Sequence, residues 1–245
     1  MPEIKKEVKS KKTDFNLNPE EMMKAGLHFG HRTSKHHPNM APFIYGVRNS
    51  IHIIDLEKTI EKFEKALQFI QKLVTENQIL LLVGTKIQAK KLVKDFAQDL
   101  SLPYVNERWL GGTLTNFETI QKRVKYFKEL EKKKETGELE KYTKKERVGF
   151  NRELRDLELK FGGLKNFNSP PDAIFVLDME KDAIAVKEAK EKDIKIIGII
   201  DTNIDPGLAD FPIPANDDAL TSLEYILNKT KEAILKARQE GGSKK

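Results

Sequence analysis

The chain has 245 residues, of which 38% are hydrophobic and 33% are charged, and its net charge is +6. Cysteine is absent, which excludes disulfides and thiolate metal sites, and no apolar run reaches the roughly 20 residues of a membrane-spanning helix. The modest basic excess favours a polyanionic partner, and we expect no membrane partner.

Both ends of the chain predict little ordered structure. Lysine alternates with glutamate near the N-terminus and little there could be buried, so residues 1–18 are predicted to form a disordered tail. Residues 240–245 are predicted to form a flexible tail. A short helix is expected over residues 19–25, because Asn18 suits the N-cap and Pro19 suits the first helical position.

Glycines, prolines and four histidines fill the next segment. Residues 26–49 are therefore predicted to form a loop with brief extended pieces. A strand is predicted at residues 51–54. Apolar residues at helical spacing then predict an amphipathic helix over residues 56–76.

Beyond that helix, unbroken apolar runs of strand length alternate with helical patterns. Continuous apolar strands that alternate with helices are typical of a parallel sheet covered on both faces. The predicted fold class is therefore α/β, a doubly wound parallel sheet, in a body made of residues 19–115 and 165–239. The predicted strands are residues 79–83, 104–105, 173–177, 195–200 and 211–213, and the predicted helices are residues 87–100, 182–192 and 219–239.

Residues 116–164 break this alternation. Apolar residues recur every three or four positions in two stretches, on either side of Gly137 and a run of charged residues. Two helices with narrow apolar seams around a polar turn predict an antiparallel coiled-coil hairpin inserted into the body. The seam residues are Phe117, Ile120, Val124 and Phe127, followed by Phe150, Leu154, Leu157, Phe161 and Leu164.

One loop lies where α/β proteins bind phosphate, between a buried strand and a helix: Gly84, Thr85 and Lys86. It lacks the glycine spacing and the Gly-Lys-Ser/Thr ending of a Walker loop, so a plain turn with a solvated lysine is the favoured interpretation. The alternative function is an enzyme that handles a nucleotide or a phosphosugar. In that hypothesis Thr85 and Lys86 would contact the phosphate, and Asp201 would act as acid or base.

Two clusters raise the question of a metal. The four histidines of residues 26–49 (His28, His31, His36 and His37) fit no known zinc-finger spacing and lack cysteine partners. Carboxylates near strand ends could hold Mg²⁺ through oxygen ligands, yet aspartate is also the ordinary residue of turns and caps. These carboxylates are Asp178, Asp201, Asp205, Asp217 and Asp218. We expect neither a metal nor another cofactor.

Three runs of the sequence resemble motifs of a known family: Gly26-Leu27-His28-Phe29-Gly30-His31-Arg32-Thr33, Asn106-Glu107-Arg108-Trp109-Leu110-Gly111-Gly112-Thr113-Leu114-Thr115-Asn116-Phe117, and Pro212-Ile213-Pro214-Ala215-Asn216-Asp217-Asp218-Ala219. The first two runs place glycine beside an aromatic ring and an arginine. Glycine lets the backbone approach a polyanion closely, while the arginine projects from it. Neither run supplies a nucleophile with a base. From about Met22 to Gln239 the chain resembles the family of the second protein of the bacterial small ribosomal subunit.

The resemblance implies a structural component of the cytoplasmic ribosome and not an enzyme. Its expected partners are small-subunit ribosomal RNA and neighbouring small-subunit proteins, including the large multi-domain protein that captures messenger RNA. Lysines would neutralise phosphates, and arginines and histidines would fix the register on folded RNA. Trp109 fits a buried core position and a base-stacking position equally well. The predicted RNA-binding residues are His28, His31, Arg32, Lys35, His36, Arg48, Arg108, Lys122, Arg123, Lys144, Lys145 and Arg147.

Overall fold

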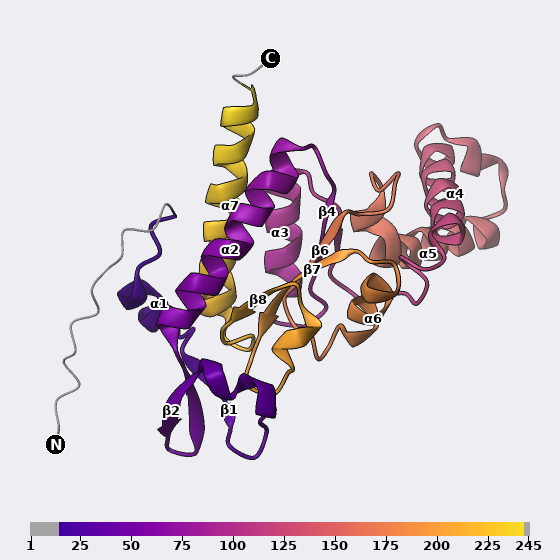
Figure 1. Cartoon of the computed structure of the whole chain (residues 1–245). Helices are drawn as coiled ribbons and strands as arrows, with labels where there is room; N and C mark the ends of the chain where they lie inside the picture. The colour runs from indigo at the N-terminus through magenta and orange to yellow at the C-terminus, as the bar shows by residue number, and fades with distance from the viewer. Residues whose placement is uncertain (1–14, 243–245) are drawn as a thin grey trace. The chain divides into compact units, whose positions relative to one another are not determined.

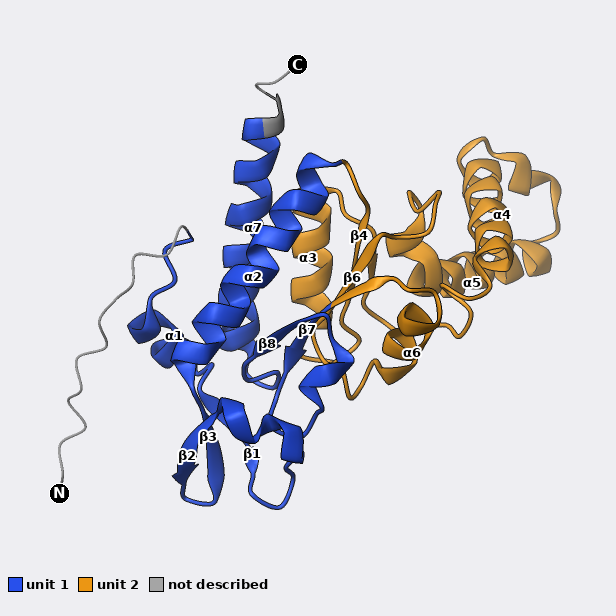
Figure 2. Cartoon of the chain, viewed as in Figure 1, with its two compact units in different colours: residues 1–76, 197–245 blue, residues 77–196 orange. Residues whose placement is uncertain are grey.

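The computed structural model describes residues 15–242, and its fold is mixed α/β (Figure 1). The chain divides into two compact units, residues 1–76 with 197–245 and residues 77–196 (Figure 2). Most of the predicted N-terminal tail, and residues 243–245 of the C-terminal one, lie outside the described residues. The division into a body and an inserted hairpin, made from the sequence, stays a prediction.

Five strands form a parallel sheet, in the order β5 (Tyr104–Val105), β4 (Leu80–Val83), β6 (Ala173–Val176), β7 (Lys195–Ile200) and β8 (Phe211–Pro214). Within the second unit, Leu82 of β4 is in register with Tyr104 of β5 and with Phe175 of β6. Every residue of β4 and β6 is buried, as the continuous apolar runs of the sequence predict. The carboxyl ends of these strands meet at one edge, and there the loops that follow β4, β5 and β6 are brought together.

The first unit contains α1 (Pro19–Ala25), β1 (Phe29–Arg32), β2 (Ile44–Arg48), β3 (Ile51–Ile54), α2 (Leu56–Thr75), β8 (Phe211–Pro214), α7 (Leu220–Gly242) and most of β7 (Lys195–Ile200). Helix α2 begins where the Asp55 carboxylate accepts a hydrogen bond from the Glu57 amide, an N-cap at 3.0 Å. Its apolar face packs against α7 and β8. Thr59 is fully buried, and its hydroxyl donates to the Pro214 carbonyl at 2.6 Å, which ties the first turns of α2 to β8.

The segment 26–49, predicted to be a loop with brief extended pieces, contains two short strands that join a three-stranded antiparallel sheet of order β1-β3-β2. A 3-10 helix, Pro38–Phe43, connects them. The sequence did not predict that these pieces pair in a sheet, because β1 has exposed ends and a half-buried middle and β2 is similarly irregular, so neither shows the alternation that marks a half-buried strand. Pairing with the more apolar β3 supplies the order that the local sequence lacks.

The second unit contains β4 (Leu80–Val83), α3 (Lys90–Leu100), β5 (Tyr104–Val105), α4 (Phe117–Glu135), α5 (Lys144–Phe161), β6 (Ala173–Val176) and α6 (Ala183–Glu191). Gly84, directly after β4, allows α3 to approach the sheet, because a Cβ there would lie 2.8 Å from Val93 Cγ2. No helix within residues 15–242 has the length and apolar content to cross a membrane.

Helices α4 and α5 pack against each other through the buried side chains predicted for their seams. A capping box between Thr143 and Glu146 begins α5, and the Tyr126 hydroxyl donates to Glu153 at 3.1 Å across the pair. Lys165 lies 4.7 Å from the centre of the Phe127 ring and 2.9 Å from carboxylate oxygens of both Glu131 and Glu158. The coiled-coil geometry and the doubly wound sheet stay predictions.

Candidate functional site

The loop after β4 lies where the enzyme hypothesis needs a phosphate site. Its donors are engaged within the protein: the Thr85 amide donates to Asp182 at 3.1 Å and the Thr85 hydroxyl donates at 2.8 Å. The Lys86 ammonium lies 3.0 Å from Asp178. Asp182 is only 2% exposed, and burial raises the pKa of its carboxyl, partly countered by the two bonds from Thr85. Carboxylates therefore engage the donors that a nucleotide phosphate would use.

A second buried carboxylate organises the loop between β5 and α4. Glu188 of α6 accepts hydrogen bonds from the Trp109 indole at 3.1 Å and from the amides of Gly112, Leu114 and Thr115 at 2.8, 2.9 and 3.2 Å. The Thr115 hydroxyl donates a further bond at 3.3 Å. Gly112 has φ of +92°, a conformation that favours glycine. The loop is thus a ring of donors around one carboxylate.

Sequence reasoning did not identify Glu188. The available signal was a glutamate among the apolar positions of its helix, since Ala185, Val186 and Ala189 are buried beside it. The same contact decides between the two interpretations of Trp109, which is 6% exposed and bonded to Glu188. Trp109 is a core residue and not a base-stacking platform.

The ionisation of Glu188 follows from these bonds. Burial alone would raise the pKa of this carboxyl, but the bonds from Leu114, Gly112, Trp109 and Thr115 stabilise the charged form and lower the pKa below its ordinary value of 4.5. Glu188 therefore carries its negative charge at neutral pH inside the protein.

Arg108 directly precedes this organised loop and is exposed. Its neighbour Glu107 pairs with Lys90 of α3. Within residues 15–242 no acidic side chain forms an ion pair with Arg108. The guanidinium is available to a partner.

In the first unit, the antiparallel sheet places two of the predicted arginines together. Arg32 of β1 and Arg48 of β2 are both in register with Ile51 of the central strand, so the two side chains lie on one face, on either side of Ile51. Both are exposed, as are Lys35 and His36. Neither arginine forms an ion pair with another described residue. This face is the most cationic surface that the three-stranded sheet presents.

Two predicted histidines are less available. The His31 Nδ1 atom lies 3.0 Å from the buried Asp201 carboxylate, and its Nε2 atom lies 3.7 Å from Asp218. The bond to Asp201 raises the pKa of His31, whereas burial lowers the pKa of His28. Gly30 permits this arrangement, because a Cβ there would lie 2.5 Å from Thr202 Cγ2. Both histidines stay candidates for RNA contact only as predictions.

One combination of side chains could hold a metal ion. His31, Asp201 and Asp217 each offer one ligand atom, and these atoms lie within 4.8 Å of one another. His31 comes from the histidine cluster considered in the sequence, and Asp201 and Asp217 come from the carboxylate cluster. Two other carboxylates of that cluster are engaged elsewhere: Asp178 pairs with Lys86, and Asp205 accepts a hydrogen bond from the Gly207 amide in a turn. One imidazole and two carboxylates suit zinc chemically. The expectation of no metal stays a prediction.

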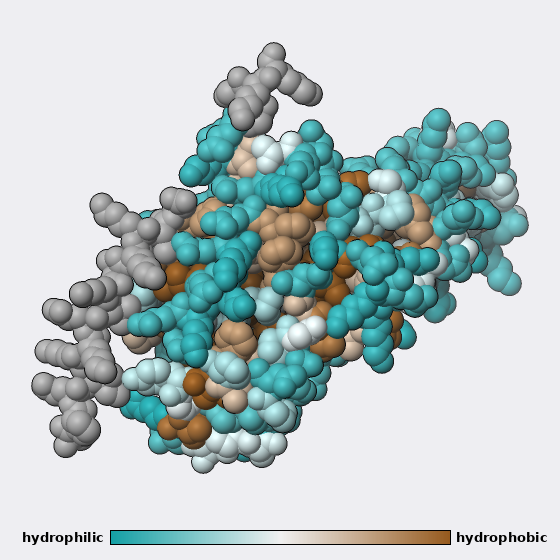
Figure 3. All heavy atoms as spheres, in the orientation of Figure 1, coloured by the Kyte–Doolittle hydropathy of each residue, from teal (hydrophilic) through white to brown (hydrophobic). Residues whose placement is uncertain are grey.

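The predicted cations of α4 and α5 are all exposed, in two groups. Lys122 and Arg123 lie in the second turn of α4, whereas Lys144, Lys145 and Arg147 begin α5 at the other end of the pair. At 1.5 Å rise per residue, about 20 Å of helix separates the groups. The visible surface of this helix pair is mostly hydrophilic (Figure 3). RNA contacted by both groups must therefore span about 20 Å.

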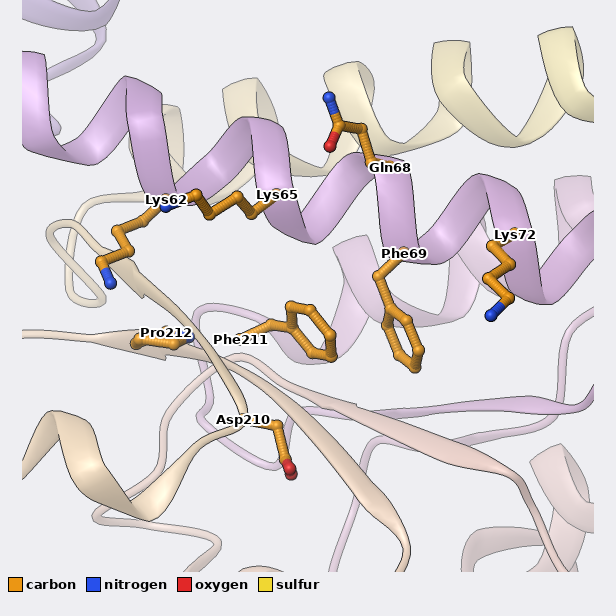
Figure 4. A pocket seen from close by; sticks show the side chains of 8 residues that line it. All are labelled: Lys62, Lys65, Gln68, Phe69, Lys72, Asp210, Phe211 and Pro212. Carbon is orange, nitrogen blue, oxygen red and sulfur yellow. The ribbon is translucent and has the colours of Figure 1, made fainter.

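A groove of about 390 Å³ lies between α2 and β8 in the first unit (Figure 4). The rings of Phe69 and Phe211 stack in it at 4.1 Å and an angle of 14°. Lysines line it, but Lys65 lies 2.7 Å from Glu61 and Lys72 lies 3.8 Å from Glu76. The third lysine of the lining, Lys62, lies 5.8 Å from the centre of the Phe43 ring.

The outer edge of β8 lacks hydrogen-bond donors. Ala215 donates its amide to Ile200 of β7 at 3.1 Å, so alternation along the strand directs the amides of Phe211 and Ile213 to the same side. The positions that face the other side are Pro212 and Pro214, which have no N–H.

Within the described residues, carboxylates engage the Thr85 and Lys86 donors at the end of β4, where a parallel α/β sheet commonly binds phosphate, and the protein is a mixed α/β one with no nucleotide loop of that kind. The chain matches the family model described as ribosomal protein S2 over residues 22–237. A relative from Marinobacter nauticus, named small ribosomal subunit protein uS2, is 43% identical over 227 residues, which cover 93% of this chain and 91% of the relative. The chain belongs to the ribosomal protein S2 family, and the resemblance seen in the three motifs is confirmed.

Glu188→Gln tests the ring of donors. At neutral pH we expect a loss of about 2–3 kcal/mol in the free energy of unfolding, because a buried charge-assisted acceptor becomes an amide whose N–H₂ faces other donors. The folded pKa of Glu188 is lowered, so its stabilisation is full above the unfolded pKa near 4.5 and disappears as pH falls through the folded pKa. Urea unfolding of both proteins between about pH 3 and pH 7 measures this difference.

Glu191→Gln is the matched control, because Glu191 lies at the end of the same helix and is exposed. Its free energy of unfolding should stay within about 0.5 kcal/mol of wild type. A pH-independent difference between Glu188→Gln and wild type would contradict the assignment of Glu188 as the charged centre of the loop.

Arg108→Ala should weaken association with small ribosomal subunits and leave the free energy of unfolding within about 0.5 kcal/mol, since the side chain is exposed and forms no ion pair. Arg108→Lys should rescue association only in part, because lysine lacks the bidentate geometry of the guanidinium. Sedimentation and thermal unfolding of both variants check these outcomes. A large loss of stability in Arg108→Ala would show that the residue serves the fold.

Proposed function

We propose that this protein is a structural constituent of the small ribosomal subunit in the cytoplasm, where it binds ribosomal RNA and docks neighbouring ribosomal proteins. Membership of the ribosomal protein S2 family and the name of the Marinobacter nauticus relative support this assignment. The family is one of ribosomal proteins and not of enzymes. The enzyme hypothesis is also disfavoured by the pairing of Thr85 with Asp182 and of Lys86 with Asp178.

The cationic face of the three-stranded sheet is the observation that carries RNA binding. Arg32 and Arg48 straddle Ile51 without ion-pair partners among the described residues, and Lys35 and His36 are exposed in the same segment. Unpaired guanidinium groups can bind phosphates bidentately without first breaking an internal bond. Lysine adds a point charge whose phosphate contact releases counterions.

Helices α4 and α5 provide the second RNA-binding segment in this proposal. We assign them to a coiled-coil hairpin inserted into a doubly wound body, whose seam residues hold the pair while its outer residues meet the subunit. The exposed side chains of Lys122, Arg123, Lys144, Lys145 and Arg147 support this role. One neighbouring protein in the proposal is the large multi-domain protein that captures messenger RNA.

Native protein should co-sediment with small ribosomal subunits in low-salt lysate. Because phosphate contacts release counterions, association of purified protein with small-subunit ribosomal RNA should weaken steeply between about 50 and 200 mM salt. Arg32→Gln with Arg48→Gln should flatten this dependence, whereas the paired and exposed Lys65→Gln should change it little. Protein that stayed entirely in the light fractions at low salt would overturn the proposed function.

Replacement of residues 128–150 by a short turn tests the hairpin. The removed segment buries its own apolar residues, Leu130 and Leu139 among them, so the rest of the chain should unfold cooperatively. Assembly into small subunits should fall because the cations at the start of α5 are lost. Circular dichroism during thermal unfolding and sedimentation measure the two effects. Loss of cooperative unfolding would show that the helix pair is integral to the core.

A further inference from the structure

A pocket of about 390 Å³ opens in the second unit at the carboxyl ends of β4 and β6. We propose that it is a protein docking site that takes an aliphatic side chain flanked by a carboxylate, presented by a neighbouring protein of the small subunit. This inference rests on the proposed function and names the chemistry of one partner. It also moves Arg108, which the sequence assigned to RNA, to a contact with protein.

The first observation is an unusual exposure of large apolar side chains at the pocket. Ile87, between β4 and α3, is 84% exposed, and Ile184, in the first turn of α6, is 57% exposed. Both line the pocket, together with the edge of the buried Trp109. Scattered exposed isoleucines are ordinary, but two beside one pocket form an apolar surface that gains from being covered.

The second observation is the charge at the rim. Lys90 pairs with Glu107, and Lys86 nearby pairs with Asp178. Arg108 and Lys181 are also at the pocket and exposed. Lys181 interacts electrostatically with the buried Asp182, whereas Arg108 has no ion-pair partner within residues 15–242. A carboxylate on the partner is therefore the complement that the rim lacks, and Arg108 can bind it through two parallel hydrogen bonds.

The third observation is that the floor of the pocket is already ordered. Asp182 holds the Thr85 amide and hydroxyl, and Glu188 holds the Trp109 indole. These residues are thus already held in place, so less conformational entropy is lost when a partner binds. The same bonds leave a nucleotide phosphate no free donor from Thr85.

RNA is the competing occupant, and the apolar side chains decide against it. Phosphates would bind Arg108 and Lys181, but a charged phosphate that covered Ile87 would lose its hydration without a compensating bond. A protein segment satisfies both kinds of group at once, since interfaces combine an apolar centre with charged residues at the rim. The observations therefore favour protein.

The test places a photo-crosslinking residue, p-benzoylphenylalanine, at position 87 of the full chain assembled into small subunits. The expected crosslink joins it to a small-subunit protein at a segment where an aliphatic residue neighbours Asp or Glu. The same crosslinker at Leu235, an exposed aliphatic position of α7 in the first unit, is the matched control and should not yield that crosslink. Crosslinks from position 87 to ribosomal RNA, or none, would overturn the proposal.

Titration of the crosslinked partner, purified, provides the second measurement. Ile87→Ser with Ile184→Ser should raise the Kd about tenfold, as loss of an interface anchor does. Arg108→Glu should weaken binding similarly, and replacement of the partner's carboxylate residue by lysine should restore it. Thermal unfolding confirms that each variant folds. Unchanged affinity in these folded variants would also overturn the proposal.

The outcomes separate the two levels of the proposal. If wild-type protein never enters small subunits, the proposed function fails. If it enters them while position 87 crosslinks to RNA or to nothing, the proposed function stands and only the docking site fails.

Discussion

One buried carboxylate determines the shape of the most unusual loop in the protein. Glu188 accepts five hydrogen bonds from four residues between Trp109 and Thr115, so a single helix side chain fixes a stretch of backbone that has no regular structure of its own. Because these donors lie inside the protein, they would carry a large desolvation cost without an anionic acceptor. Arg108 directly precedes Trp109, so the hydrogen bond between Trp109 and Glu188 also fixes where the backbone of Arg108 lies.

The same use of acids appears at the end of β4. Parallel α/β sheets commonly bind phosphate outside the carboxyl ends of their strands, with backbone amides, a hydroxyl and a lysine as donors. Here Asp182 takes the amide and hydroxyl of Thr85, and Asp178 takes Lys86. The protein's own carboxylates thus replace a ligand, and the loops become rigid surface. An architecture widely used for small-molecule chemistry here serves as a scaffold for macromolecular contacts.

The buried strands and long helices could be predicted because their signals are local. The apolar run of β4 and the periodic stripe of α2 each identify their element without information from the rest of the chain. The pairing of β1 and β2 in a sheet could not be predicted, because their mostly exposed residues show no alternation of apolar and polar positions. Both strands pair with β3, and this pairing is recognised only in the folded sheet. Within the candidate site, the exposure of Arg108 was anticipated from its glycine neighbours.

The pairings within the site escaped prediction for a different reason. The contact of Glu188 with Trp109 spans 79 positions, and that of His31 with Thr202 spans 171. No spacing rule relates residues so far apart, so the sequence could mark Glu188 as unusual in its helix without naming its partners. The assignments of individual cations to RNA were likewise beyond sequence, since exposure and freedom from internal ion pairs depend on the folded neighbours.

The prolines of β8 have a consequence for the protein before it meets any partner. A terminal strand with free amides is a template on which another chain can add a strand. Pro212 and Pro214 remove the outward-facing donors at this edge, so a second copy finds no amide there to pair with. The edge of β8 therefore gives a second copy no amide donor on which to add a strand, so its sequence itself blocks this route to sheet extension.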